Sequence, residues 1–115
     1  MVLSGVPDGC ALVTEELFGP AVHVKPFDTY EEALHRVNDS DYGLQAGVYT
    51  AQMDRIMRAH RELEVGCVLA GEIPTWRVDH MPYGGVKASG FGREGLRYAL
   101  EEYTDDRLLV LSEAP

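Results

Sequence analysis

The chain has few basic residues and no long apolar run. Ten Lys and Arg residues stand against nineteen Asp and Glu residues, so the net charge is −9 at pH 7. A surface of this sign repels phosphate groups, and we expect binding to neither nucleic acid nor an anionic membrane. Its apolar stretches are far shorter than the roughly 20 residues that cross a bilayer. Because the chain opens with no basic segment before an apolar core, we expect no signal peptide and a cytoplasmic location.

Cysteine is also scarce, and the cysteines and histidines follow no metal-ligand pattern. Cys10 and Cys67 are far apart in the sequence, and no two histidines have His-x-x-x-His spacing. These spacings predict no zinc site. Without a signal peptide we expect both thiols to be reduced, and Cys67 lies in an apolar run that is typical of a buried structural cysteine.

The hydrophobic pattern predicts a single α/β domain over residues 1–115. The length suffices for one modest core but not for two. Asp28 or Thr29 is expected to cap the first helix, which begins at Tyr30, and Thr50 the second. A third helix is predicted over 93–103. Short strands, which alternate with these helices as in α/β units, are expected at 11–14, 21–25, 44–49, 65–70 and 107–111.

Residues 90–95 read Gly-Phe-Gly-Arg-Glu-Gly and literally match the dinucleotide-binding fingerprint. That motif works only between a strand and a helix, and residues 81–85 do not resemble a strand. We therefore expect these glycines to let an irregular loop pass close to neighbouring backbone before a helix begins.

Three other stretches carry a family resemblance. They are Glu-Glu-Leu-Phe-Gly-Pro at 15–20, Asn38 followed by Tyr-Gly-Leu at 42–44, and Pro-Tyr-Gly-Gly-Val-Lys-Ala-Ser-Gly-Phe-Gly-Arg-Glu-Gly at 82–95. In order and spacing they resemble the C-terminal part of aldehyde dehydrogenases, and the similarity runs from about residue 3 to 111. The resemblance implies the end of the catalytic domain plus the terminal oligomerisation strand. It also implies that the nucleotide-binding domain and the catalytic cysteine lie outside this segment, since neither Cys10 nor Cys67 matches the nucleophile.

The resemblance assigns two residues to a cofactor, NAD or NADP. Glu16 matches the glutamate that accepts hydrogen bonds from the nicotinamide-ribose hydroxyls, as an ionised carboxylate can. Phe18 matches the aromatic residue that contacts the nicotinamide ring. Without the motif, Glu16 would be a surface residue and Phe18 a core residue.

Glu94 matches a glutamate proposed to relay protons from the general base to solvent. The alternative is that Glu94 opens the third helix and interacts favourably with the helix dipole. Both interpretations stay open at this point.

Residues 74–85 lie where family members line the substrate tunnel. This stretch is similar to enzymes that act on lactaldehyde, phosphonoacetaldehyde or, without phosphorylation, glyceraldehyde 3-phosphate. Arg77 can grip an anionic substrate through its guanidinium fork, with His80 as a further donor and Tyr83 nearby. The alternative is a structural Arg77 that holds the loop. Those relatives carry Asn-Asp where this chain has Gly71-Glu72, which puts the order of the loop in doubt.

The reaction implied is NAD(P)-dependent oxidation of a small aldehyde to a carboxylate, through a thiohemiacetal, hydride transfer and thioester hydrolysis. We expect the segment to be inactive alone, because no cysteine matches the nucleophile. We also expect a homo-oligomer, or pairing with aldehyde dehydrogenase subunits. The alternatives are a non-catalytic interaction module, which would pair through exposed strand edges, and the complementing subunit of a split enzyme.

Overall fold

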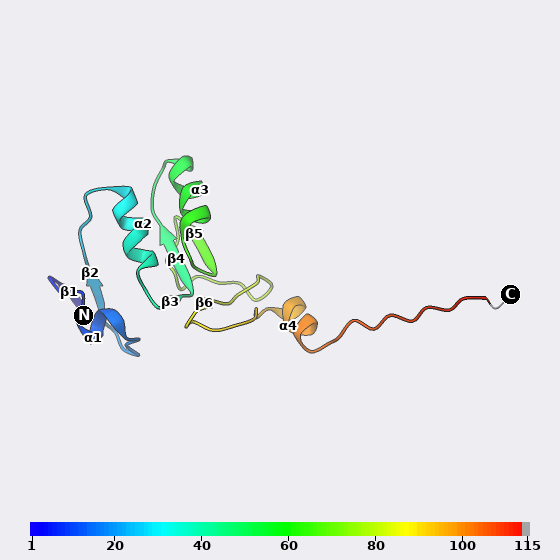
Figure 1. Cartoon of the computed structure of the whole chain (residues 1–115). Coiled ribbons are helices and arrows are strands. Elements are labelled where there is room, and N and C mark those ends of the chain that lie inside the picture. The colour runs from blue at the N-terminus through cyan, green and yellow to red at the C-terminus, as the bar shows by residue number, and fades with distance from the viewer. Residues whose placement is uncertain (114–115) are drawn as a thin grey trace.

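The structure is a computed structural model, and it describes residues 1–113 (Figure 1). Helices and strands alternate along most of this chain, as the hydrophobic pattern predicts. In chain order the elements are β1 (Val2–Ser4), α1 (Ala11–Thr14), β2 (Val22–Val24), α2 (Tyr30–Asn38), β3 (Tyr42–Gly43), β4 (Gln45–Val48), α3 (Met53–Glu62), β5 (Cys67–Ala70), β6 (Val86–Lys87) and α4 (Leu96–Glu102).

The strands form three separate two-stranded pairs. β4 and β5 run parallel, from Gln45 opposite Cys67 to Val48 opposite Ala70, and α3 connects them. β1 and β2 are also parallel, whereas β3 and β6 are antiparallel. A parallel pair joined through a helix is the α/β unit expected from the sequence, and it is the centre of this fold.

Helix α2 begins where its sequence predicts. The Thr29 hydroxyl accepts a hydrogen bond from the Glu32 backbone N–H at 3.2 Å, and the Glu32 carboxylate accepts one from the Asp28 N–H at 2.8 Å. This exchange is a variant of the capping box: the Thr29 hydroxyl satisfies a donor of the first helical turn, and the Glu32 carboxylate reaches the N–H one residue before the cap. The bond from Asp28 N–H holds the pKa of the Glu32 carboxyl below its ordinary value.

A small apolar core lies where α2 and α3 meet the β4–β5 pair. Leu34 of α2, Ala59 of α3 and Leu63 just after α3 are each at most 8% exposed. Around them pack the half-buried residues Tyr30, Ala46, Val48, Val65 and Val68. Many large apolar side chains outside this core remain exposed, so much of the apolar surface of this segment faces no partner within the described chain.

Several element boundaries differ from the prediction. Residues 11–14 form α1 rather than a strand, because the Cys10 carbonyl accepts local hydrogen bonds from Val13 and Thr14. The second helix is preceded by Gln52, not Thr50, whose hydroxyl instead accepts from the Gln52 N–H in a tight turn. β1 was not expected, since its three residues carry no periodic signal.

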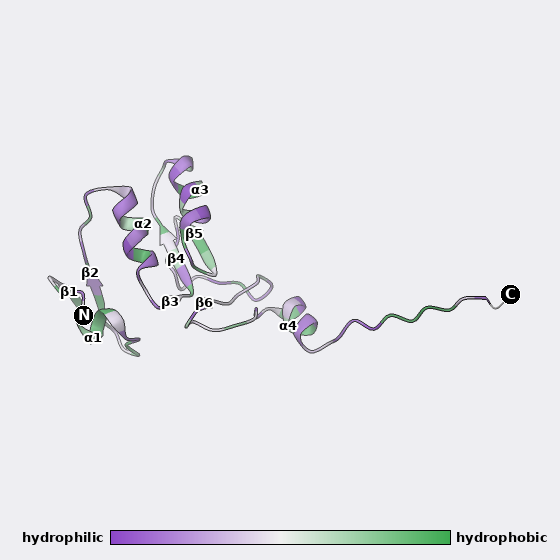
Figure 2. Cartoon of the chain, viewed as in Figure 1, coloured by the Kyte–Doolittle hydropathy of each residue, from purple (hydrophilic) through white to green (hydrophobic). Residues whose placement is uncertain are grey.

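The predicted last strand, residues 107–111, is extended but pairs with no strand of residues 1–113. Four consecutive side chains, Leu108 to Leu111, are 74 to 87% exposed, and Figure 2 shows the apolar stretch along this tail. The tail contributes to a radius of gyration of 19.5 Å, against roughly 13 Å for a compact domain of this length. In the described chain no helix has both the length and the apolar composition to span a bilayer.

Candidate functional site

The three motifs singled out in the sequence meet at one open groove. Its volume is about 490 Å³. The first motif contributes Glu16, the second the Tyr-Gly-Leu stretch at 42–44, and the third Ala88 and Ser89. The remaining lining residues are Val37, Ser40, Gln45 and Val65. Stretches that lie more than 70 positions apart at their extremes therefore build a single surface.

Hydrogen bonds fix the second motif to the third. The Gly43 N–H donates to the Ser89 hydroxyl oxygen at 2.9 Å, and β3 pairs with β6 beside it. The Lys87 ammonium donates to the carbonyl oxygens of Asn38 at 2.7 Å and Ser40 at 3.1 Å. Lys87 and Ser89 therefore hold residues 82–95 against the second motif, because each one bonds directly to backbone in or next to that motif.

The side-chain hydrogen bonds of Asn38 explain why an asparagine precedes the Tyr-Gly-Leu stretch. Its side-chain amide donates to the Glu62 carbonyl oxygen at 2.7 Å and accepts from the Glu64 N–H at 2.8 Å. One residue thus connects the C-terminal ends of α2 and α3 through both halves of its amide. Val37 and Ser40, which lie next to Asn38 in the sequence, line the groove.

Glu16 and Phe18 lie on the exposed segment that follows α1. Glu16 lines the groove, and its carboxylate accepts no hydrogen bond from residues 1–113. Phe18 is 92% exposed, so the alternative of a core residue is wrong for this chain. A carboxylate with open acceptor sites at a groove fits the hydroxyls of a ribose, and an exposed aromatic face beside it fits a planar ring.

A second cluster brings together three of the other predicted site residues. The Arg77 guanidinium stacks over the Tyr83 ring, with its carbon 4.3 Å from the ring centroid. Arg77 Nη1 lies 3.3 Å from Glu94 Oε2. Tyr83 and Glu94 are joined by two backbone hydrogen bonds, so the cluster rests on a small antiparallel bridge. His80 lies in the same loop and is exposed.

The dipole interpretation of Glu94 is wrong. Helix α4 begins at Leu96, three residues later than predicted, and it has no acidic residue in its first turn. Gly95 precedes it with φ +113°, a backbone conformation outside the helical region. Glu94 therefore belongs to the loop, where its carboxylate faces Arg77 rather than a helix end.

The glycines at 90–95 that match the dinucleotide-binding fingerprint belong to the loop between β6 and α4. The strand before Gly90, β6, has only two residues and pairs antiparallel with β3, unlike the parallel strand of a dinucleotide-binding unit. Gly90, Gly92 and Gly95 all have positive φ. The Arg93 N–H, which in a dinucleotide site would be available to phosphate, donates to the Glu102 carboxylate at 3.2 Å. The structure therefore agrees with the irregular-loop prediction.

Gly71, where the relatives carry an asparagine, occupies a turn at the end of β5. It has φ +75°, in the left-handed region, and its N–H donates to the Val48 carbonyl oxygen at 2.9 Å. Glycine adopts this conformation readily, and asparagine is the next most tolerant residue. At this position glycine therefore forms a hydrogen-bonded turn, with its backbone in a conformation that asparagine also tolerates.

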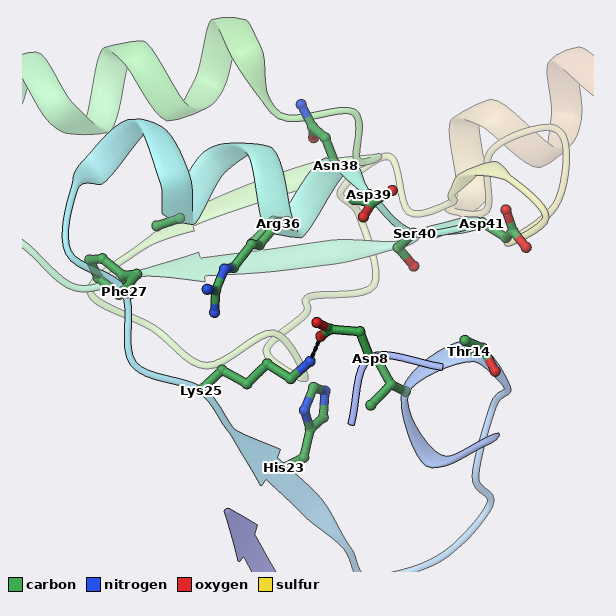
Figure 3. A pocket seen from close by; sticks show the side chains of 13 residues that line it. Asp8, Thr14, His23, Lys25, Phe27, Arg36, Asn38, Asp39, Ser40 and Asp41 are labelled. Atoms are coloured by element: carbon green, nitrogen blue, oxygen red, sulfur yellow. Dashed lines mark hydrogen bonds and ion pairs between the residues drawn. The ribbon is translucent and has the colours of Figure 1, made fainter. Parts of the chain in front are cut away.

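Figure 3 shows a larger cavity, of about 780 Å³, between the α2 side of the fold and the segment around β2. It contains none of the predicted site residues. The Lys25 ammonium pairs there with the Asp8 carboxylate, and Arg36 pairs with Glu32 of the same helix. No group of three His, Cys, Asp or Glu residues within the described chain is placed to hold a metal ion. Lys25 thus has an acidic partner in the cavity lining, and the partner of Arg36 lies on α2 outside that lining.

Comparison with known proteins decides the family. Residues 1–109 match the Aldehyde dehydrogenase family. The chain belongs to this family. As an aldehyde dehydrogenase segment it is 49% identical over 111 residues to 3-sulfolactaldehyde dehydrogenase of Priestia megaterium, covering 96% of this chain and 23% of that protein. It is also 43% identical over 96 residues to lactaldehyde dehydrogenase of Methanococcus maripaludis, covering 84% of this chain and 21% of that protein.

The fold agrees with solved aldehyde dehydrogenases. The NAD⁺ complex of aldehyde dehydrogenase from Bacillus cereus superposes with a TM-score of 0.85 at 41% identity, over 90% of this chain and 21% of that one. The chain thus spans about a fifth of the length of the relatives it matches. These similarities confirm the family and the fold class inferred from the three motifs.

Proposed function

We propose that this segment supplies part of the cofactor site and one wall of the substrate site in an enzyme that oxidises a small aldehyde to a carboxylate with NAD or NADP. The observation that carries the proposal is the convergence of the three motifs on the groove that contains Glu16. A coenzyme site needs an acceptor for the ribose hydroxyls and a flat apolar contact for the ring. Glu16 and Phe18 offer both from one exposed segment.

When bound, NAD or NADP supplies the hydride acceptor for the oxidation. Glu16 would hold the ribose of that cofactor, and Phe18 would restrict the ring. The nucleophile and the general base belong to the part of the family sequence that this chain does not match. Neither Cys10, which is exposed ahead of α1, nor Cys67, half-buried in β5, lines the groove.

For the substrate we propose an aldehyde that carries an anionic group. Arg77 stacks on Tyr83 and its side chain is 42% exposed, so its guanidinium has an aromatic contact and is still accessible to a ligand. His80, exposed in the same loop, would add a further donor. Glu94 is the proposed proton relay, and its exposed carboxylate is consistent with exchange with solvent. The relative from Priestia megaterium acts, by its name, on a sulfonated aldehyde.

For the assembly we propose self-association through residues 107–111. An extended apolar segment with unpaired backbone groups adds readily to an exposed strand edge. The same property supports the alternative interaction module, which would need no catalytic partner.

A chimera tests the activity. The 111-residue matching segment of the Priestia megaterium enzyme is replaced by this chain, and aldehyde-dependent NADH or NADPH formation is measured. We expect activity in the chimera and none in the 115-residue chain alone. A folded chimera that binds the coenzyme but oxidises no aldehyde contradicts the proposal. Activity of the isolated chain that survives Glu16→Ala and is lost with Cys10→Ser contradicts the expected silence.

A further inference from the structure

Arg77 already has an anionic partner in this structure. Glu94 Oε2 lies 3.3 Å from Arg77 Nη1, while the face of the guanidinium is covered by the Tyr83 ring. The contact uses one of the five N–H donors of the arginine and lacks the two-point geometry of a strong Arg–carboxylate pair. Arg77 therefore binds Glu94 weakly, in a position where an external anion can compete.

The backbone keeps Glu94 in this position. The Tyr83 N–H donates to the Glu94 carbonyl oxygen at 3.1 Å, and the Glu94 N–H donates back to the Tyr83 carbonyl oxygen at 2.6 Å. Tyr83, which stacks on the guanidinium, and Glu94, which neutralises it, are thus joined by two backbone hydrogen bonds. These bonds fix the Glu94 backbone next to Tyr83, so the carboxylate is tethered within reach of Arg77.

We propose that Glu94 is a specificity-determining residue, a built-in competitor that occupies Arg77 until an anionic substrate group displaces it. The inference rests on the proposed anion-binding role of Arg77 and extends it to Glu94. A negative charge beside the guanidinium lowers the affinity for any anion, so only a group that can make two hydrogen bonds to the fork replaces the single bond to Glu94. An anion that makes only one hydrogen bond to Arg77 does not displace Glu94.

Methylphosphonate, titrated into the 115-residue chain at constant ionic strength, tests this. Binding is followed by two-dimensional NMR through the Arg77 side-chain N–H and the Tyr83 and Glu94 amides. We expect Glu94→Gln to lower the Kd by about 3- to 10-fold, since it removes the competing charge at an exposed site. Arg77→Met should abolish the Arg77-dependent shifts in either background.

Glu101→Gln is the matched control. Glu101 forms a similar single contact, 3.1 Å, with Arg97 on the exposed face of α4, and its loss should leave the Kd unchanged. A Kd that stays constant or rises in Glu94→Gln overturns the competitor role of Glu94. If binding is still lost in Arg77→Met, the anion-binding role of Arg77 stands. Binding that persists in Arg77→Met, or no Arg77-dependent binding in Glu94→Gln, overturns the anchor and the inference together. Aldehyde oxidation by the unsubstituted chimera tests the proposed function separately, because it does not depend on methylphosphonate binding to the 115-residue chain.

Discussion

The Lys87 ammonium lies 2.7 Å from the carbonyl oxygen of Asn38, at the last residue of helix α2. A positive charge at this point also interacts favourably with the C-terminal end of the helix dipole. Because Lys87 belongs to the third motif and Asn38 to the second, this contact joins two of the motifs that contribute residues to the groove. It explains why a lysine follows the Gly-Gly-Val stretch, which sequence motifs alone do not.

Lys87→Met should lower the free energy of unfolding by about 2–3 kcal/mol, because two carbonyl oxygens and the Glu64 carboxylate lose their partner. Lys25→Met is the control. The two lysine side chains are similarly exposed, 23% and 21%, but Lys25 contacts only the exposed Asp8 and should cost at most about 1 kcal/mol. Urea unfolding measures both. Equal effects would show that Lys87 has no special role.

Glu16→Gln in the chimera should raise the KM for NAD or NADP and lower kcat/KM by about 30- to 150-fold. The substitution replaces a charged acceptor of the ribose hydroxyls by a neutral one, and hydrogen bonds to a neutral acceptor are weaker. Glu15→Gln supplies the comparison, because Glu15 is equally exposed but does not line the groove. Steady-state kinetics at saturating aldehyde would separate the two. An equal loss in both variants would place the effect in the local backbone and not in cofactor contact.

Arg77→Ala in the chimera should lower kcat/KM for an anionic aldehyde by about 30- to 150-fold, the loss of a charge-assisted fork of roughly 2–3 kcal/mol. Propanal makes no such bond and should be almost unaffected. Arg77→Lys should recover only part of the loss, because an ammonium lacks the planar fork. If Arg77 only braces the loop, both aldehydes lose equally and the Tm falls with them.

The tail should make the 115-residue chain self-associate at micromolar concentration, an affinity of roughly 8 kcal/mol. Replacing Leu109 and Leu111 together by Asp should abolish the association, because charge prevents burial of the apolar stretch. Met57→Asp, which adds the same charge at another exposed apolar position on α3, should leave it intact. Sedimentation velocity gives the answer. A monomeric wild-type chain at about 100 µM would contradict the proposed role of the tail.

Acid should destabilise the chain through the capping box of α2. The bond from the Asp28 N–H lowers the pKa of Glu32 from its ordinary value of 4.5. A depressed folded pKa adds stability above the unfolded value, and that stability is lost as pH falls through the folded pKa. The free energy of unfolding should therefore stay level near pH 6–7 and fall below about pH 4.5. Glu32→Gln should flatten this fall.

Thr29→Ala provides the contrast for that experiment. It removes the other half of the capping box and should lower stability by about 1 kcal/mol at every pH, since a hydroxyl does not titrate in this range. Urea unfolding at several pH values distinguishes the two variants. An unchanged acid slope in Glu32→Gln would assign the acid sensitivity to other carboxylates.

The amino-acid sequence by itself determined the local features whose causes are local. The helix that begins at Tyr30 follows from the Thr29 cap and the apolar spacing, and β4 and β5 fall within the short strands predicted at 44–49 and 65–70. Family membership also follows from motifs, because their order and spacing can be read from the sequence. The proposed roles of Glu16 and Glu94 rest on the same motifs.

Only the tertiary structure decided how distant stretches meet. The bond from Gly43 to Ser89, and the stacking of Arg77 on Tyr83 beside Glu94, join residues whose separation in sequence carries no signal. A short apolar run can form a strand only if a neighbouring strand is available to pair with it. Residues 11–14 instead form hydrogen bonds to local carbonyl oxygens and become a helix, and residues 107–111 stay extended because no strand of the described chain pairs with them.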